Sequence, residues 1–266
     1  MSLRNLAVSL AATAFLAGCA TTHEQRMEPV ATAGEQPRTS AREQRLDAAR
    51  IHTELGQRYM ARGQLEVALE KLQTALKFDS NYVPANTVIA VLYERIGKLQ
   101  LAERHYRQAV KIQPDKGAPN NNLGQFLCKV GRIDESLKYF NQAVADPFYD
   151  TPAAAYLNAG TCLLKAGRAQ QAETPLRNAL TLQPNSAEAL YLMASALQQQ
   201  KDYFRARAFI QRFEALGQPS PDALLLAYQI ENGLGEGDVA RQYAQQLRTL
   251  FPDSEQAHSL NTRATP

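Results

Sequence analysis

A repeat with a period of 34 residues runs through most of this 266-residue chain. It is visible in columns of residues spaced one unit apart. The first column, with steps of 34, 34, 36, 34 and 34, is Gly56, Ala90, Gly124, Gly160, Ala194 and Tyr228. The second is Ala68, Ala102, Ser136, Ala172, Ala206 and Ala240, and the third is Ala75, Ala109, Ala143, Ala179, Phe213 and Leu247. The fourth is Gly63, Gly97, Gly131, Gly167, Lys201 and Gly235. Such periodicity predicts a stack of similar units, each packed against its neighbours.

Each column has a steric role, and together the columns predict a pair of antiparallel helices in every unit. Small residues in the first two columns let the paired helices approach closely. The glycine column lies between the helices and suits the turn of a helical hairpin. Pro114, Pro184 and Pro252 cannot continue a helix and end their units. The pattern resembles the tetratricopeptide repeat over residues 49–254, which implies an all-α, right-handed superhelical solenoid of six repeats.

The last two units depart from the pattern. Lys201 replaces the turn glycine, Phe213 replaces a small residue and Glu231 replaces an apolar one. Because the outer face of a terminal repeat has no neighbour, we interpret these units as a cap. Residues 255–266 are predicted to form a frayed C-terminal tail.

The first residues have the pattern of an export signal. Residues 1–18 combine Arg4 with an apolar stretch too short to span a bilayer, which predicts a signal peptide. The stretch ends in Leu16-Ala17-Gly18-Cys19, which resembles the bacterial lipobox and implies lipidation of Cys19. An ordinary signal peptide with an incidental cysteine is the alternative. Ala20 is not the Asp that commonly retains such lipoproteins at the inner membrane, so we expect a lipid anchor on the periplasmic face of the outer membrane.

Residues 19–48 are predicted to be the lipidated cysteine and a flexible tether, because they contain few large apolar residues. The 29 basic and 26 acidic residues nearly balance, so we expect no nucleic-acid partner. The four histidines show no metal-ligand spacing, and the sequence has no phosphate-binding loop, nucleophile elbow or paired-carboxylate motif. We therefore expect a monomeric binding protein without metal, cofactor or enzymatic activity.

Two cysteines of the repeat region are candidates for a disulfide. With positions counted from the start of each unit (49, 83, 117 and so on), Cys128 is at position twelve of the third unit and Cys162 at position ten of the fourth. Two residues are about 200° apart around a helix, so the side chains project from opposite flanks of neighbouring first helices. These flanks face each other, and the periplasm is oxidising. The positions predict a Cys128–Cys162 bond, with two separate buried thiols as the alternative.

Some segments are more specific than the repeat itself. These are Asn120-Asn121-Asn122-Leu123-Gly124-Gln125-Phe126-Leu127-Cys128, Ala145-Asp146-Pro147-Phe148-Tyr149 and Asn158-Ala159-Gly160-Thr161-Cys162. With the lipobox and the two-residue insertion near Asp150, they resemble the PilF/PilW family of type IV pilus biogenesis lipoproteins. The resemblance implies a pilotin, which escorts subunits of the secretin PilQ to the outer membrane and promotes their multimerisation. A general envelope scaffold that docks cell-wall hydrolases or outer-membrane assembly factors is the alternative function.

In tetratricopeptide solenoids the groove is lined by the first helices, at positions five, nine and twelve of each unit. Here these positions predict a protein-binding groove of Thr53, Gln57, Met60, Thr87, Val91, Glu94, Asn121 and Gln125. The mixture of apolar and uncharged polar side chains suits a semi-apolar segment of a partner. It lacks the Lys, Arg and Asn cluster that would bind a C-terminal carboxylate. We expect Met60 and Val91 to face outward into the groove.

Overall fold

The computed structural model describes residues 40–217 and 219–262, except for the side chains of residues 261 and 262. The predicted signal peptide and Cys19 lie outside the described residues. Within these ranges the chain is all-α, and none of the helices has the length and apolarity that would let it cross a membrane. The helices are α1 (Ala41–Ala61), α2 (Leu65–Phe78), α3 (Val83–Arg95), α4 (Leu99–Ile112), α5 (Gly117–Lys129), α6 (Ile133–Ala145), α7 (Pro152–Lys165), α8 (Ala169–Leu182), α9 (Ala187–Gln199), α10 (Tyr203–Glu214), α11 (Pro221–Leu234), α12 (Gly237–Leu250) and α13 (Glu255–Thr262).

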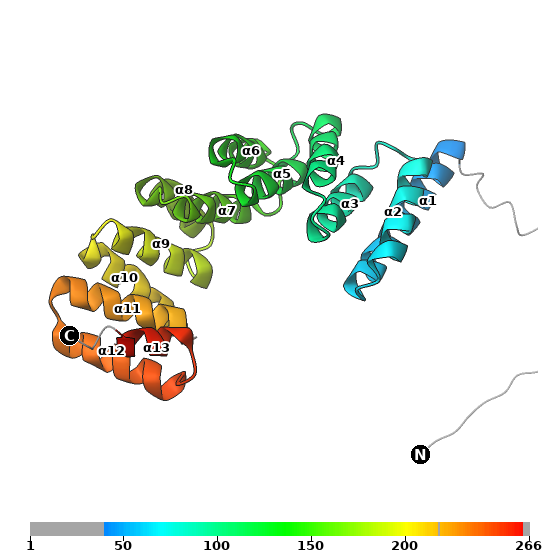
Figure 1. Ribbon diagram of the computed structural model, residues 1–266. Coiled ribbons are helices and arrows are strands. Elements are labelled where there is room, and N and C mark those ends of the chain that lie inside the picture. Colours follow the sequence, from blue (N-terminus) through cyan, green and yellow to red (C-terminus); the bar gives the residue numbers. More distant parts are fainter. Residues whose placement is uncertain (1–39, 218, 263–266) are drawn as a thin grey trace, which may run out of the picture. The chain divides into compact units, whose positions relative to one another are not determined.

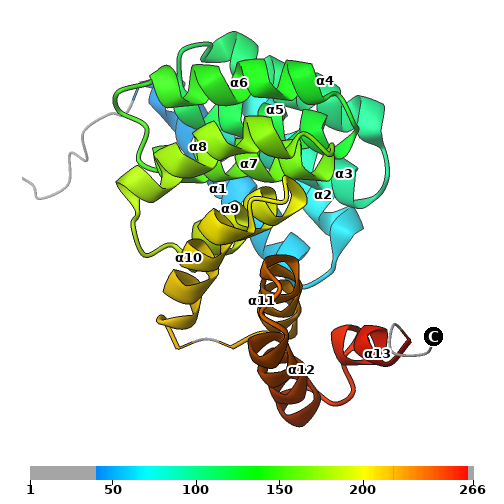
Figure 2. The same ribbon diagram turned by 90° about the vertical axis from the view of Figure 1, so that its left-hand side faces the viewer.

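The helices from α1 to α12 form six consecutive hairpins, one for each sequence unit. Each hairpin packs against the next in chain order, from α1 and α2 to α11 and α12 (Figures 1 and 2). The first helix of each hairpin also contacts the first helix of the following one. This arrangement confirms the predicted all-α superhelical repeat, and it brings α1, α3, α5 and α7 into one row.

The turn column has the backbone conformation that its glycines predict. Gly63, Gly97, Gly131, Gly167 and Gly235 have φ between 71° and 80°, in the left-handed region that glycine adopts without steric cost. Lys201 occupies this column in the fifth unit and has φ of 62°. The backbone of the turn is therefore kept even where its glycine is replaced.

Small residues at the hairpin interfaces are fully buried, as the columns predict. Ala68, Ala102, Ala172 and Ala206 have no exposed surface. A Cβ atom added to Gly124 would lie 2.8 Å from Cδ1 of Phe140 on the partner helix. Glycine in the first column thus leaves room for a large side chain sixteen residues later, at position twenty-four of the same unit.

The N-terminal boundary of the fold differs from the prediction. Helix α1 begins at Ala41, so residues 41–48, which were expected in the tether, are helical. Ser40 caps the helix: its Oγ accepts a hydrogen bond from the Glu43 backbone N–H at 3.2 Å, and Glu43 Oε2 accepts one from the Ser40 N–H at 2.6 Å. These two reciprocal hydrogen bonds form a capping box, which marks the start of a helix. The prediction missed it because it considered only the polar composition of the segment.

The C-terminal boundary also differs, because part of the expected frayed tail is helix α13. The Ser254 hydroxyl accepts a hydrogen bond from the Ala257 N–H at 3.1 Å near the start of this helix. Ala257 and Leu260 are buried against Leu224 and Leu247 of α11 and α12. A thirteenth helix thus covers the apolar face that the sixth repeat would otherwise expose.

Candidate functional site

Two adjoining hollows lie along the first helices of the first three repeats. One, of about 380 Å³, is lined by Gln57, Val83, Pro84, Thr87, Val88, Gln113, Ala118, Pro119 and Asn122. The other, of about 420 Å³, is lined by Val91, Glu94, Arg95, Tyr106, Asn122, Gln125, Phe126 and Lys129. Asn122 borders both hollows, which together we call the groove.

The structure brings five of the eight predicted groove residues to this surface. All three residues at position nine line it, namely Gln57, Val91 and Gln125. Thr87 and Glu94 line it from positions five and twelve of the second repeat. Val91 keeps 42% of its surface exposed, so an apolar side chain in the groove is open to a partner.

The other three predicted residues line neither hollow. Thr53 is 3% exposed and its hydroxyl donates to the Ala49 carbonyl at 2.7 Å. Asn121 is 6% exposed, and its Oδ1 accepts a hydrogen bond from Nδ2 of Asn158 in the fourth repeat at 3.0 Å. Met60 packs against the cluster of buried residues that contains Leu72 and Leu92. Met60 is thus partly buried and lines neither hollow.

Helix geometry explains both the missed and the misplaced residues. The observed groove is lined from positions two, six, nine and thirteen, as in Pro84, Val88, Asn122 and Lys129. With about 100° between successive residues, this face is rotated by roughly 60° from the face of positions five, nine and twelve. In the first and third repeats, side chains at positions five and twelve contact the following repeat instead, as Asn121, Cys128 and Met60 do. In the second repeat Thr87 and Glu94 still reach the groove from these positions. Asn122 is one of the groove residues that the prediction missed. The sequence feature that could have identified it is the recurrence of Asn at position six, since Asn158 has the same position in the next repeat.

Charged groups border the second hollow, and most of them are engaged. Glu94 accepts hydrogen bonds from Lys129 Nζ at 2.6 Å and from the Tyr106 hydroxyl at 3.1 Å. Burial and the neighbouring carboxylate raise the pKa of Tyr106, which keeps its hydroxyl a donor. Arg95 Nη1 donates to the Met60 carbonyl at 3.2 Å, which holds the guanidinium at the groove edge. The expectation that no carboxylate-binding cluster is present was drawn from positions five, nine and twelve, whereas Arg95 and Lys129 stand at position thirteen.

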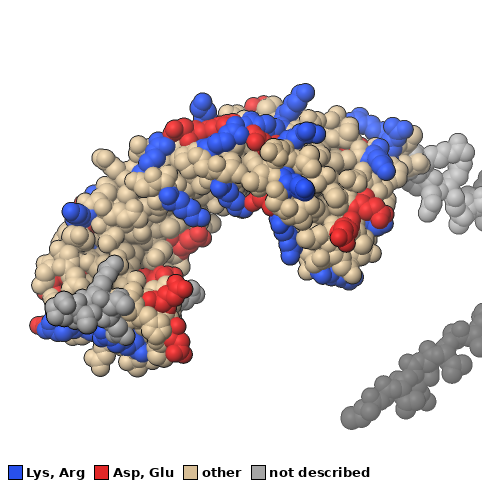
Figure 3. Space-filling model, in the orientation of Figure 1, with Lys and Arg blue, Asp and Glu red and all other residues tan. Residues whose placement is uncertain are grey.

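The second helices carry a network of ion pairs between repeats two and three. Arg107 binds Glu103 and Glu135, and Arg132 binds the same two carboxylates. Figure 3 shows basic and acidic side chains interspersed along the edge where α4 and α6 lie. Because the charges of this network pair with one another, it connects neighbouring repeats and leaves no strong local field of one sign.

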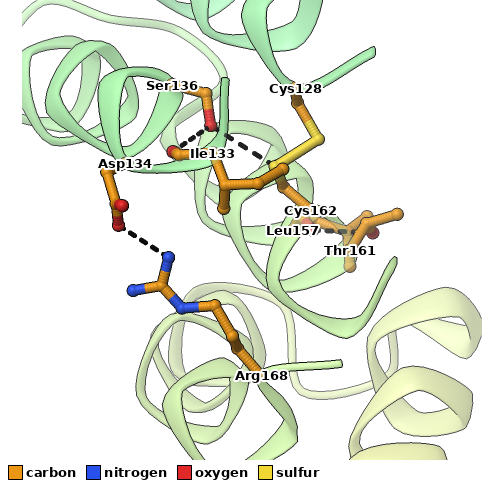
Figure 4. Close-up of a disulfide and its surroundings, with 8 residues drawn as sticks. All are labelled: Cys128, Ile133, Asp134, Ser136, Leu157, Thr161, Cys162 and Arg168. Atoms are coloured by element: carbon orange, nitrogen blue, oxygen red, sulfur yellow. Dashed lines mark hydrogen bonds and ion pairs between the residues drawn. A yellow bond between two sulfur atoms is a disulfide. The ribbon is translucent and has the colours of Figure 1, made fainter. Parts of the chain in front are cut away.

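Beyond the groove, a disulfide joins α5 to α7 in the structure. It links Cys128 to Cys162 with a Cα–Cα distance of 5.8 Å, which is a usual value for such bonds (Figure 4). Cys162 is fully buried and its Sγ lies 3.3 Å from the Ser136 hydroxyl. Cys128 is at position twelve of its repeat and Cys162 at position ten of the next. The same two positions meet between the first two repeats, where Met60 packs on the cluster that contains Leu92. The bond therefore sits next to the C-terminal end of the groove.

Potential ligands for a metal ion are not grouped in the described part of the chain: no three His, Cys, Asp or Glu side chains are placed to share one ion there.

Comparisons with known proteins agree with this architecture. The sequence profile of the tetratricopeptide repeat matches residues 53–119, 87–150, 121–187 and 157–223. The type IV pilus assembly protein PilF of Pseudomonas aeruginosa is 28% identical over 223 residues, which cover 84% of this chain and 88% of PilF.

Two solved structures are similar along almost their whole length. The crystal structure of PilW, described as a widely conserved type IV pilus biogenesis factor, has a TM-score of 0.72 and 33% identity, covering 80% of this chain and 97% of PilW. The structure of Pseudomonas aeruginosa PilF has a TM-score of 0.71 and 26% identity, covering 83% and 99%. The chain therefore belongs to the tetratricopeptide-repeat proteins and, among them, to the PilF and PilW family of type IV pilus biogenesis factors.

Proposed function

We propose that this protein is an outer-membrane pilotin, a lipoprotein that binds secretin subunits and promotes their localisation and multimerisation for type IV pilus biogenesis. Its membership of the PilF and PilW family supports a role in type IV pilus biogenesis. The groove on repeats one to three supports a binding role, and it is the observation on which the proposal mainly rests. A secretin subunit bound there would be kept near its target membrane at a raised effective concentration.

The chemistry of the groove indicates what kind of segment would bind. Val83, Pro84 and Val88 give the first hollow apolar walls, while Gln57, Thr87 and Asn122 supply uncharged hydrogen-bonding groups. An extended segment with alternating apolar and polar side chains would satisfy both. Secretin strands that have not yet paired have this character, and covering them would prevent premature pairing.

The proposed anchor is Cys19. A triacylated Cys19 would hold the protein on the membrane, because each buried methylene contributes about 0.8 kcal/mol and more than one chain makes anchoring stable. We expect Cys19→Ala to leave the leader uncleaved or the protein mislocalised, as seen by membrane fractionation and intact mass. A Cys19→Ala protein that is cut normally and stays in the outer membrane would exclude lipid anchoring.

The proposed site is tested by Val91→Glu, with Val67→Glu as the matched control. Val67 lies on α2, outside the groove, and is 36% exposed against 42% for Val91. Both variants should fold as the wild type does. Val91→Glu should reduce secretin multimers at least tenfold in a complemented deletion strain. A carboxylate there removes an apolar contact and must be desolvated against the partner, which costs more than the roughly 1.4 kcal/mol of a tenfold change. Immunoblots of heat-resistant secretin multimers measure the effect.

Two outcomes would contradict the proposal at different levels. Normal multimers with Val91→Glu would move the site away from the groove. Normal secretin multimers in the deletion strain itself would exclude the pilotin role and favour a general envelope scaffold.

A further inference from the structure

A cavity in the last two repeats lies outside the groove. It has a volume of about 350 Å³, is open to solvent on one side and lies between α10, α11 and α12. Phe213, Leu224 and Val239 form apolar walls, and Gln242, Tyr243 and Gln246 supply polar groups. Glu214, at the end of α10, also lines it. This cavity therefore has an apolar body with a carboxylate at its border.

The repeat offers an internal comparison for this cavity. The corresponding hollow between repeats two and three is lined by Val110, Asn120, Glu135, Lys138, Tyr139 and Gln142. Val110 and Glu214 are both at position twenty-eight of their units. The first four repeats have an aliphatic residue there, namely Leu76, Val110, Val144 and Leu180. Packing against a following repeat favours an aliphatic side chain at this position, and the sixth repeat, which has Arg248 there, has no following repeat. The carboxylate of Glu214 between the fifth and sixth repeats therefore needs another explanation.

The surroundings of Glu214 provide a hydrogen bond but no opposite charge among the described residues. The Tyr243 hydroxyl donates to Glu214 Oε2 at 3.0 Å. The nearby Glu231 of α11 has the same sign, and Arg207 of α10 is engaged in an ion pair with Glu231. Partial burial, with Glu231 as a second cause, raises the pKa of Glu214. The carboxylate is thus partly desolvated without a compensating cation, an arrangement that costs stability.

We propose that this cavity binds the Arg or Lys side chain of a partner polypeptide, with Glu214 as its counter-charge. The aliphatic stem of such a side chain would lie along Phe213, Leu224 and Val239, since long basic side chains bury their stems on apolar surface. The cationic head would reach Glu214, and charge-assisted hydrogen bonds of this kind are strong. Gln242 and Gln246 at the rim could bind the backbone of the partner. This site is made mainly by second helices, so it can be occupied together with the groove.

The test uses purified full-length protein and three small probes followed by two-dimensional NMR. N-acetylarginine methylamide carries the charge, N-acetylcitrulline methylamide has nearly the same shape without it, and N-acetylglutamate methylamide has the opposite charge. The arginine probe should shift the amide signals of Phe213 and Tyr243 with an affinity at least tenfold above that of the citrulline probe. Its affinity should fall as the pH is lowered through the raised pKa of Glu214, because protonation removes the counter-charge.

Variants separate binding from folding. Glu214→Gln should lower the affinity for the arginine probe at least tenfold, whereas Glu188→Gln, on the exposed surface of α9, should not change it. Glu214→Leu, which restores the aliphatic residue of the earlier repeats, should also abolish binding while keeping or raising the melting temperature. Equal responses to arginine and citrulline, an unchanged affinity in Glu214→Gln, or shifts of the same signals with protein concentration alone would overturn the proposal, the last in favour of a second copy of the chain.

Discussion

Reduction of the Cys128–Cys162 disulfide is expected to lower the free energy of unfolding by about 3–4 kcal/mol. We propose that this bond forms in the exported protein. The two cysteines are 34 residues apart in sequence, and closing a loop of this length removes conformational entropy from the unfolded chain. For a domain of this size a loss of that order lowers the melting temperature by roughly 10 °C.

The position of the bond makes its effect more than local. In a repeat protein each unit is stabilised mainly by its neighbours, so loss of one interface can divide the array. The disulfide connects the third repeat to the fourth, and Cys162 is packed beside Phe140 and Ala159. The groove in repeats one to three would then unfold more easily from the C-terminal side.

Intact mass with and without reductant, on protein exported to the periplasm, should differ by two hydrogen atoms. Thermal melts of the oxidised and reduced forms then give the stability difference. The Cys128→Ala/Cys162→Ala double variant is the control, since its melting temperature should not respond to reductant. Identical masses would mean that the thiols are free, and identical melts would mean that the cross-link stabilises nothing.

The fold could be predicted because its signals recur. Six copies of each column show which residues are small for steric reasons, and the deviating Lys201 keeps the turn conformation of its glycine neighbours. The two boundaries could not be placed by period, since nothing repeats there. Ser40 and Ser254 fix them locally through side-chain caps.

The predicted groove and the two hollows fall in the same repeats, but the hollows lie on a face rotated around the helix. Position nine lies on both faces, which is why Gln57, Val91 and Gln125 line the hollows. Whether the neighbouring positions face a partner or the next repeat depends on how far each hairpin is turned against the following one. That angle depends on packing between units, as in the contact of Asn121 with Asn158, and no single helix determines it.

The cavity of Glu214 was missed for a different reason. Departures from the repeat in the last two units were interpreted together as capping. The structure separates them: Glu231 is buried in an ion pair with Arg207, α13 covers the end of the stack, and Glu214 borders a cavity. A charged residue at a position that is aliphatic in the preceding repeats is the signal that would have identified it.

Replacement of Gly160 by Tyr is expected to destabilise the fourth repeat by more than about 3 kcal/mol, at the upper end of what overpacking costs. A Cβ atom at this position would lie 2.5 Å from Leu176 Cδ2 and 2.6 Å from Leu176 Cγ. The clash involves Cγ, the branch point of the leucine, so a rotation about χ2 alone cannot relieve it, and a change of χ1 would have to displace the side chain within a packed interface. Both residues are buried between α7 and α8.

The sixth repeat shows how the same site can hold a tyrosine. Tyr228 stands at the position of Gly160, and Ala244 stands at the position of Leu176. Tyr228 packs on the cluster that contains the buried Ala244, so the large and small partners have changed places. We therefore expect Leu176→Ala to cost about 2–5 kcal/mol alone but to restore much of the stability of Gly160→Tyr. A double-mutant cycle by urea denaturation of the oxidised protein should give a favourable coupling energy of about 2 kcal/mol. If the two losses are additive, the fourth hairpin does not tolerate the exchange of large and small residues that the sixth hairpin shows. The exchange in the sixth repeat would then depend on α13.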